Sequence, residues 1–412
     1  MRSWAWVWMG VLGCAGDKVD DTATPASPCG DGTWGEVADP ATAIHVRADG
    51  DDAGDGSLES PVATLDAALA LSRARSADKV IFVGPGTFAV SDLTIAGDPG
   101  DGSTDDGLVI DACDSESVLQ ASADDAPGVR VSGAQDVSLS RLTISGGAPG
   151  LFLWQGAKVK LNQIAIRQGI KVGVVVSGHE TLVEATHLDI SDTQPDGGGA
   201  GGFGLGLSAA TMSLSSARIS NSAVAGLFLD GDGEVGDVTL TDVEVDGTSA
   251  DGDGAYGRGL QAQDLVRLVL SGGSYTNNQD AGIYVLQAAD LDIEGVTVTG
   301  VTAGAVPDSE DTTGDGIVIT SVDDSGALYD PADFRVTLTS NSSAEQARAG
   351  FLLEGVTAEA NGNTSADGTF GLVFQGDTDL TGSDQPAATD LSGAPLDVNR
   401  AELDAALLSP AR

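Results

Sequence analysis

Short groups of apolar residues alternate with polar residues along most of the chain, and a glycine precedes each group. Alternation of this kind is typical of β-strands, because successive side chains of a strand point to opposite faces. The glycines are Gly128, Gly150, Gly173, Gly204, Gly226, Gly259, Gly282, Gly316, Gly350 and Gly371. Most steps between them are 21 to 23 residues long, and the others are 31 to 34. A repeat of about 22 residues predicts stacked units that cover one another's apolar faces.

Each repeat contains a second apolar group at an offset of five residues from the first. Val238-x-Leu240, for example, precedes Val243-x-Val245. On a straight strand an odd offset would turn the second group outward, so the backbone must bend between the two. Each repeat then forms three short strands around a coil. About ten or more stacked coils predict an all-β fold, a right-handed parallel β-helix, with Leu240 and Ile293 inside.

Two other repeat or β folds fit the pattern less well. A leucine-rich repeat of similar period needs an L-x-x-L-x-L-x-x-N block and a helix on its convex side, and the sequence shows neither. A β-sandwich would not keep the glycines in phase. The sparse aromatic residues, 4% of the chain, indicate that the core is aliphatic.

The N-terminus has the pattern of an export signal. Residues 1–13 contain Arg2 followed by an apolar run that is too short to span a membrane. Val11-Leu12-Gly13-Cys14 resembles a bacterial lipobox, which implies that Cys14 carries the lipid and anchors the protein in a membrane. No acidic residue directly follows Cys14, and in lipoproteins this favours the outer membrane or cell surface. A generic secretory signal is the alternative. Residues 14–43 predict a solvated, lipidated tether.

Residues 44–128 predict an N-terminal cap and the first coils. A helix is expected from about Pro61 or Thr64 to Arg75, with Ser60 before Pro61 as its N-cap. Its inward stripe would cover the open end of the solenoid. The stripe consists of Leu65, Ala68, Leu69 and Ser72. Regular rungs follow over 129–375, and 376–412 predict a C-terminal cap with a short helix at 400–408.

The same segment resembles a known family. Asp49-Gly50-x-Asp52, Ser60-Pro61 and Val83-Gly84-Pro85-Gly86 are similar to the opening of exported bacterial members of the pectin-lyase-like β-helix family. The resemblance implies the β-helix fold. It also implies relatives that cleave or epimerise acidic polysaccharides, often with an arginine base beside bound calcium or with paired aspartates.

The sequence lacks the signatures that such enzymes carry. It has no Asp-His pair, no Gly-His-Gly and no Arg-x-Lys, and the nearest match is Gly178-His179-Glu180. No catalytic residue is therefore predicted, and the absence of these motifs favours a protein that is not an enzyme. A polysaccharide lyase or hydrolase with an unrecognised site stays the alternative.

Charge excludes some partners. With 62 acidic and 19 basic residues the net charge is −43, which repels nucleic acid and polyanions such as pectate or alginate. One basic cluster occurs within a single rung, and we interpret it as a solvated face. It comprises Lys158, Lys160, Arg167 and Lys171.

The longer repeats carry their extra residues at one corner. The insertions 192–204, 246–259 and 300–316 follow the third strand, whereas 320–334 follows the first. Register would align the first three along one side of the rod, where loops on a rigid scaffold can bind ligands. Tyr256 and Arg258 are the candidates for stacking on and hydrogen bonding to a neutral glycan. Neutral, functionless insertions are the alternative.

Clustered acidic side chains, some of them in these loops, are the candidates for holding Ca²⁺, which takes six to eight oxygen ligands. They are Asp230, Asp232, Asp251, Asp253, Asp311 and Asp315. Solvated acidic surface is the favoured interpretation, and no cofactor is required. Cys29 and Cys113 remain after Cys14, and an exported protein would be expected to pair them rather than keep two free thiols.

Together these features predict an exported, lipid-anchored surface β-helix. Its expected role is that of a non-catalytic scaffold or a carbohydrate- or envelope-binding protein. An adhesin-like surface protein is a further alternative.

Overall fold

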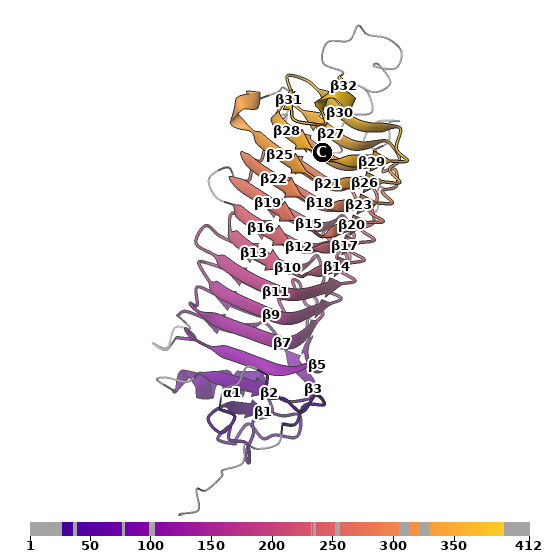
Figure 1. Cartoon of the computed structure of the whole chain (residues 1–412). Helices are drawn as coiled ribbons and strands as arrows, with labels where there is room; N and C mark the ends of the chain where they lie inside the picture. The colour runs from indigo at the N-terminus through magenta and orange to yellow at the C-terminus, as the bar shows by residue number, and fades with distance from the viewer. Residues whose placement is uncertain are drawn as a thin grey trace, which may run out of the picture.

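In the computed structural model, parallel strands stack into a right-handed β-helix that forms a long rod (Figure 1). The structure describes residues 27–35, 39–75, 79–98, 104–231, 233, 236–251, 256–304, 313–321 and 329–390. The signal, Cys14 and the candidate helix at 400–408 lie outside these ranges. None of the described helices has the length and apolar character needed to cross a membrane.

One long side of the rod is a twelve-stranded parallel sheet. In spatial order its strands are β4 (Leu93–Ala96), β6 (Val129–Ser132), β8 (Leu151–Trp154), β10 (Val172–Ser177), β12 (Phe203–Ser208), β15 (Ala225–Asp230), β18 (Arg258–Gln263), β21 (Ala281–Leu286), β24 (Asp315–Thr320), β27 (Ala349–Glu354), β30 (Phe370–Gln375) and β32 (Thr389–Asp390). The ten strands from β6 to β30 each begin at or next to one of the repeat glycines.

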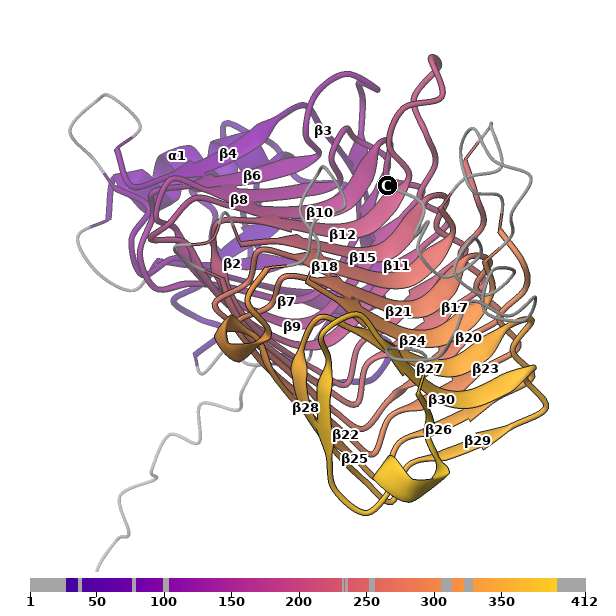
Figure 2. The same cartoon turned by 90° about the horizontal axis from the view of Figure 1, so that it is seen from above.

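A twenty-stranded sheet forms the other two sides. The strands of the first coils are β1 (Ile44–Val46), β2 (Val80–Val83), β3 (Gly86–Val90), β5 (Val109–Ala121), β7 (Val137–Ser145), β9 (Lys158–Arg167) and β11 (Leu182–Ser191). Later coils contribute pairs of shorter strands: β13 (Thr211–Ser215) and β14 (Arg218–Ser220), β16 (Asp237–Thr241) and β17 (Glu244–Asp246), β19 (Arg267–Ser271) and β20 (Ser274–Thr276), β22 (Asp290–Glu294) and β23 (Thr297–Thr299), β25 (Arg335–Thr339) and β26 (Ser342–Ala344), β28 (Thr357–Asn361) and β29 (Thr364–Ala366), then β31 (Asp379–Thr381). Two short 3₁₀ helices lie at Pro331–Asp333 and Gln385–Ala387. Viewed from above, the three sides enclose the core (Figure 2).

The predicted bend between the two apolar groups of a repeat is confirmed. Arg141, Gln163 and His187 occupy the left-handed region there, with φ of 54°, 54° and 55°, and Ser216 and Asp242 repeat the conformation in later coils. A residue with positive φ reverses the alternation of the strand, so the second group again points inward. β7, β9 and β11 pass through the bend unbroken, whereas later coils divide into two strands.

The core is a stack of aliphatic side chains in register. In the twelve-stranded sheet Leu205 pairs with Leu227, and Leu227 pairs with Leu260, all of them buried. Leu240 and Ile293 are each 1% exposed, as the offset rule predicted. Because each coil buries its apolar side chains against the coils before and after it, no coil needs a complete core of its own.

The repeat glycines are explained by close backbone approach. A Cβ on Gly226 would lie 2.6 Å from the carbonyl oxygen of Gly259 and 2.4 Å from Cγ1 of Val245. Both distances are shorter than real Cβ contacts, and the same clash with the next glycine's carbonyl oxygen recurs from Gly128 to Gly350. The glycines therefore recur at a regular spacing because the same crowded corner, which has no room for a Cβ, occurs in each of these coils along the rod.

The expected N-terminal helix forms as α1 (Leu65–Arg73), with Leu65, Ala68, Leu69 and Ser72 buried. It packs against β1, β2 and β4 in the first coil. The predicted cap at Ser60 is wrong. Thr64 is the N-cap, its hydroxyl accepts from the Ala67 N–H, and Asp52 in turn accepts from the Thr64 backbone N–H and hydroxyl.

Candidate ligand-binding face

The outward side chains of the twelve-stranded sheet form two straight rows along the rod, because its strands pair in register. One row contains Arg130, Phe152, Val175, Gly206, Phe228, Gln261 and Tyr284. The second contains Ser132, Trp154, Ser177, Ser208, Asp230, Gln263 and Leu286. The first half of this face, from β6 to β18, is partly exposed, and we call it the aromatic face.

Phe152 and Trp154 form the centre of the aromatic face. Their ring centroids lie 5.3 Å apart at an interplanar angle of 21°, which is a stacked geometry. The Arg130 guanidinium carbon lies 5.7 Å from the Phe152 centroid and 6.0 Å from that of Trp154. Two hydrogen bonds to Asp92, of 2.8 and 2.9 Å, hold this guanidinium in place. The result is a pre-ordered cluster of two rings and one cation.

A second aromatic pair lies further along the same face. Phe203 and Phe228 are 5.2 Å apart at 42°. Gly206 pairs with Phe228 in the neighbouring strand. Because glycine has no side chain, nothing projects from the sheet beside the Phe228 ring at this position. The two aromatic pairs are separated by β10, whose outward residues Val172 and Val175 are also partly exposed.

Loops border the face at both edges, as the repeat pattern predicted. The three long insertions lie between β11 and β12, β17 and β18, and β23 and β24, and thus enter the sheet at the same edge. The insertion after β24 leaves it at the opposite edge. There Tyr329 is one of the few exposed large apolar side chains of the described residues, and its ring packs edge-on against Phe334.

Asp196 fixes the first of these loops. Its carboxylate accepts hydrogen bonds from the Gly198 and Ala200 backbone N–H groups and lies 3.0 Å from Lys171 Nζ. These contacts, the Ala200 N–H foremost, lower the pKa of Asp196 to about 2. Asp196 is therefore ionised at neutral pH and contributes negative charge at the border of the aromatic face.

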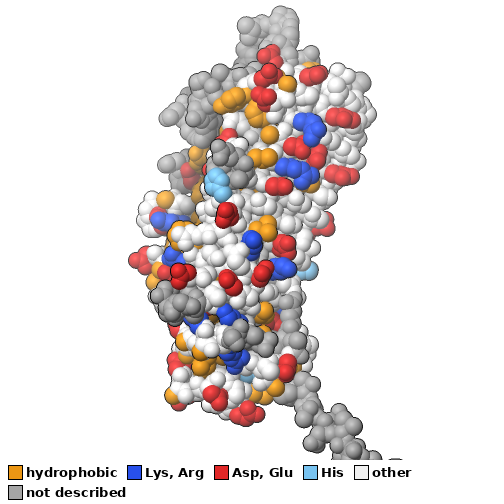
Figure 3. Space-filling view, turned by 90° about the vertical axis from the view of Figure 1, so that its left-hand side faces the viewer, with side chains coloured by type: hydrophobic (Ala, Val, Ile, Leu, Met, Phe, Trp, Pro, Cys, Tyr) orange, Lys and Arg blue, Asp and Glu red, His pale blue; other side chains and the backbone are white. Residues whose placement is uncertain are grey.

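The basic cluster in the rung of β9 does not form a cationic patch. Three of its members contact carboxylates: Lys171 contacts Asp196 as above, Arg167 lies 2.7 Å from Asp189, and Lys160 lies 3.9 Å from Glu184. Charges on a neighbouring side of the rod are likewise mixed, with basic side chains beside acidic ones (Figure 3). The described residues of this surface form no extended positive region that could bind a polyanion.

The structure contradicts the assignment of Arg258 as a sugar contact. Arg258 is 1% exposed, its Nε lies 2.5 Å from Asp280 Oδ2, and its guanidinium carbon lies 3.9 Å from the Tyr284 centroid. It is the first residue of β18 rather than part of a projecting loop. Tyr256 is partly exposed, but its ring lies 5.4 Å from the same guanidinium.

The calcium assignment is also wrong for Asp315. Its carboxylate is buried and accepts hydrogen bonds from the Arg348 guanidinium and the Ala349 N–H. Over the parts of the chain that the structure describes, no group of three His, Cys, Asp or Glu side chains could hold a metal ion. Asp230 and Asp251 lie within these parts, whereas Asp232, Asp253 and Asp311 fall outside them.

Arg258, Asp280, Asp315 and Arg348 together form a buried ionic group on successive coils. They line a small cavity with Tyr284 and Thr313. Two arginines face two aspartates, so their formal charges cancel. Because the carboxylates contact arginines and are shielded from solvent, the geometry fits structural ion pairs rather than groups that meet a polymer.

Sequence reasoning missed the aromatic face, although a signal was present. Phe152, Trp154 and Phe228 stand two or four residues after a repeat glycine, at the outward positions of the first strand. With so few aromatic residues in the chain, finding them on one side of one sheet is informative.

No family model matches the chain, and no curated protein matches it either. Among solved structures, it is similar to the mannuronan C-5 epimerase AlgE6 A-module of Azotobacter vinelandii, with 15% identity, a TM-score of 0.45, and coverage of 80% of this chain and 93% of the other. For pectate lyase Pel9A the identity is 10%, the TM-score 0.42, and the coverage 86% of this chain and 79% of the other. For the Agl-KA catalytic domain the identity is 13%, the TM-score 0.46, and the coverage 87% of this chain and 70% of the other.

These similarities concern the arrangement of the chain and carry no statement about activity. The neighbours are right-handed parallel β-helix proteins of the pectin-lyase-like fold. The strand pairing described above already defines the architecture on its own. The chain is a right-handed parallel β-helix.

Proposed function

We propose that the protein is an exported glycan-binding protein that holds a neutral or amino polysaccharide on the aromatic face. The observation that carries this proposal is the stacked, partly exposed pair Phe152 and Trp154 with Arg130 beside it. Rigid aromatic rings offer a large contact area at a low cost in conformational entropy. A few fixed polar groups beside such rings are the usual composition of a ligand site.

The geometry of the rod suits an extended chain. Neighbouring strands lie about 4.8 Å apart, so the rows of the sheet present contacts at a constant interval along the rod axis. A polymer lying along the rows would meet Phe152 and Trp154 first and Phe203 and Phe228 further on. The insertions before β12 and β18 enter the sheet at one edge of this stretch.

Charge selects the class of glycan. Asp230 lies on the face, Asp196 and Arg130 are paired with Lys171 and Asp92, and the whole chain carries a net charge of −43. A polyanionic polysaccharide would be repelled by this field, whereas a neutral or amino polymer would not.

Membrane attachment through Cys14 is part of the proposal. It rests on the lipobox-like run before Cys14 and on the solvated composition of residues 15–26. Replacing Cys14 by Ser should release the protein from the membrane fraction. Retention of this variant in the detergent phase, with normal processing, would contradict lipid attachment.

The direct test is a glycan array together with co-sedimentation on insoluble neutral and amino polysaccharides, run beside lyase and hydrolase assays on pectate and alginate. We expect weak, reproducible binding to neutral or amino polymers and no turnover of the uronates. Release of β-elimination products from a uronate polymer would overturn the proposal in favour of a polysaccharide lyase.

A further inference from the structure

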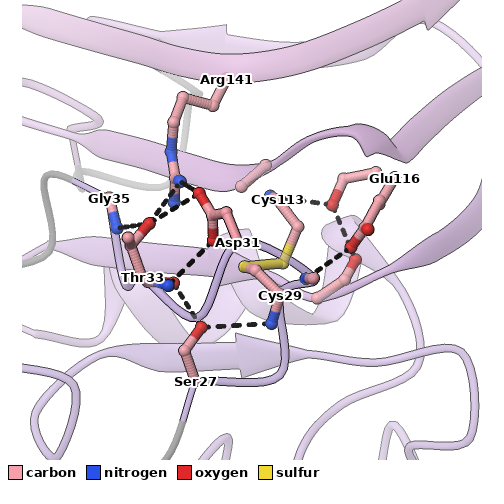
Figure 4. Close-up of a disulfide and its surroundings, with 12 residues drawn as sticks. Ser27, Cys29, Asp31, Thr33, Gly35, Cys113, Glu116 and Arg141 are labelled. Atoms are coloured by element: carbon pink, nitrogen blue, oxygen red, sulfur yellow. Dashed lines mark hydrogen bonds and ion pairs between the residues drawn. A yellow bond between two sulfur atoms is a disulfide. The ribbon is translucent and has the colours of Figure 1, made fainter.

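Residues 27–35 form a strap that lies on the outside of the twenty-stranded sheet (Figure 4). Its first attachment is covalent. Cys29 forms a disulfide with Cys113 of β5, across a Cα–Cα distance of 5.2 Å and a sequence separation of 84. Beside it, the Gly30 N–H donates to Glu116, also in β5, at 3.0 Å.

The second attachment is ionic and reaches one coil further. Arg141 of β7 is buried, and its Nη1 contacts Asp31 Oδ2 at 3.2 Å and Thr33 Oγ1 at 3.0 Å. Its Nε contacts the buried Asp111 of β5 at 3.1 Å. One guanidinium therefore joins the strap to two consecutive strands.

The third attachment is apolar. The Trp34 ring packs at 4.8 Å from Phe82 and at 5.6 Å from His45, which pair with each other on β2 and β1. Phe82 pairs in turn with Asp111, so the strap covers one outward row of the sheet from β1 to β5. Its disulfide and its ionic contacts, however, join it to β5 and β7 and not to β1.

This arrangement places the first coil inside a closed covalent loop. β1, α1, β2, β3 and β4 all lie between Cys29 and Cys113 in the sequence. A pull on the chain ahead of Cys29 passes through the disulfide into β5. It does not run through the residues of the loop, because the disulfide is the shorter covalent path.

The first coil is the part that most needs this protection. On one edge β1 pairs with β2, and on its other edge the described residues offer no full strand, only the single bridge from Val46 to Val62. A terminal unit of a solenoid has a neighbour on one side only, so it is the first to peel away under load. Internal strands such as β5 pair on both sides.

We propose that the strap is a mechanical bypass, which transmits load from an N-terminal attachment through the disulfide directly to β5 and leaves the first coil unloaded. A load on the N-terminus in the cell presupposes the proposed membrane attachment. The mechanical behaviour of the strap depends only on the described residues, so it can be tested on protein without lipid.

The experiment is single-molecule force spectroscopy on the chain beginning at Cys14, with one handle on the Cys14 thiol and one at Arg412. We expect the C-terminal coil, which the Arg412 handle loads directly, to open in every variant, and the oxidised protein to show no release of the first coil before its inner coils yield. In a Cys29→Ala, Cys113→Ala variant, an additional low-force event should precede the others. It should release up to 84 residues, or roughly 290 Å of extended chain at ~3.5 Å per residue.

Two controls separate the bypass from general stability. Asp31→Ala keeps the disulfide and should behave as the parent protein. Moving the handle to the exposed Glu59, through Glu59→Cys with Cys14→Ser, loads the first coil directly and should give low-force opening with the disulfide intact. If the variant without the disulfide resists as much force as the parent, or if the Glu59 attachment is as strong as the Cys14 attachment, the bypass is wrong.

Discussion

At the scale of single residues, position in the coil decides what a side chain can do. Arg258 and Arg335 are both first residues of strands and both contact an aspartate. Arg258 is buried against Asp280 and the Tyr284 ring, whereas Arg335 lies exposed beside Asp290. The same chemical pair is thus an internal element of the fold in one place and a solvated surface contact in the other.

Replacing these two arginines should therefore have unequal costs. Arg258→Ala leaves the buried Asp280 without its arginine, and we expect a loss of about 3–5 kcal/mol in the free energy of unfolding. Arg335→Ala should cost at most about 1 kcal/mol, because solvent screens the exposed pair. Denaturant unfolding of both variants measures the difference. Equal, small losses would show that Arg258 is not a structural residue.

The crowded glycine corner gives a second prediction at this scale. Gly226→Ala forces a Cβ against the Gly259 carbonyl and should cost about 1–3 kcal/mol. Gly206 offers the matched control, because a Cβ there would meet only Val172 Cγ1, at an ordinary 3.5 Å. Gly206→Ala should be neutral or slightly stabilising. A Gly226→Ala protein as stable as Gly206→Ala would contradict the close approach.

At the scale of strands and turns, the left-handed bend sets which residues enter the core. Leu240→Asp would bury a charge in the aliphatic stack and should lower the free energy of unfolding by several kcal/mol. Thr239 lies next to it but points outward, so Thr239→Asp should change stability by no more than about 0.5 kcal/mol. Thermal unfolding of the two variants tests the register. Similar destabilisation at both positions would mean that the strand is placed wrongly.

Periodicity was enough to predict the strands, the bend and the inward row, because burial against neighbouring coils imposes the same pattern in every repeat. It was not enough for Ser60, where Asp52 and Thr64 form a cap that depends on a loop folding back from eleven or more residues away. It also failed for Arg258, because sequence shows the charge but not the Asp280 and Tyr284 that enclose it. Contacts between coils have no local signature.

At the scale of the whole molecule, the two halves of the twelve-stranded sheet differ. From β8 to β15 its outer side chains include two partly exposed aromatic pairs, and from β21 to β30 the outer row Tyr284, Val318, Leu352 and Val373 is buried. Both aromatic pairs therefore lie in the first half of the sheet. Along the rod, the strap therefore holds the N-terminal end, the partly exposed aromatic face follows it, and the outer row of the sheet is buried in the remaining half.

The proposed function requires that the aromatic face bind the glycan. The most direct measurement is the affinity of Phe152→Ala and Trp154→Ala proteins for the best neutral or amino polymer, with Val266→Ala as the control. Val266 is an exposed apolar residue just ahead of β19 in the other sheet. Loss of a stacked ring should weaken binding by about 1–3 kcal/mol, or roughly 5- to 150-fold, by analogy with ring stacking on nucleic-acid bases. Val266→Ala should bind as the parent does. Unchanged affinity in both ring variants, with their stability intact, would contradict the account.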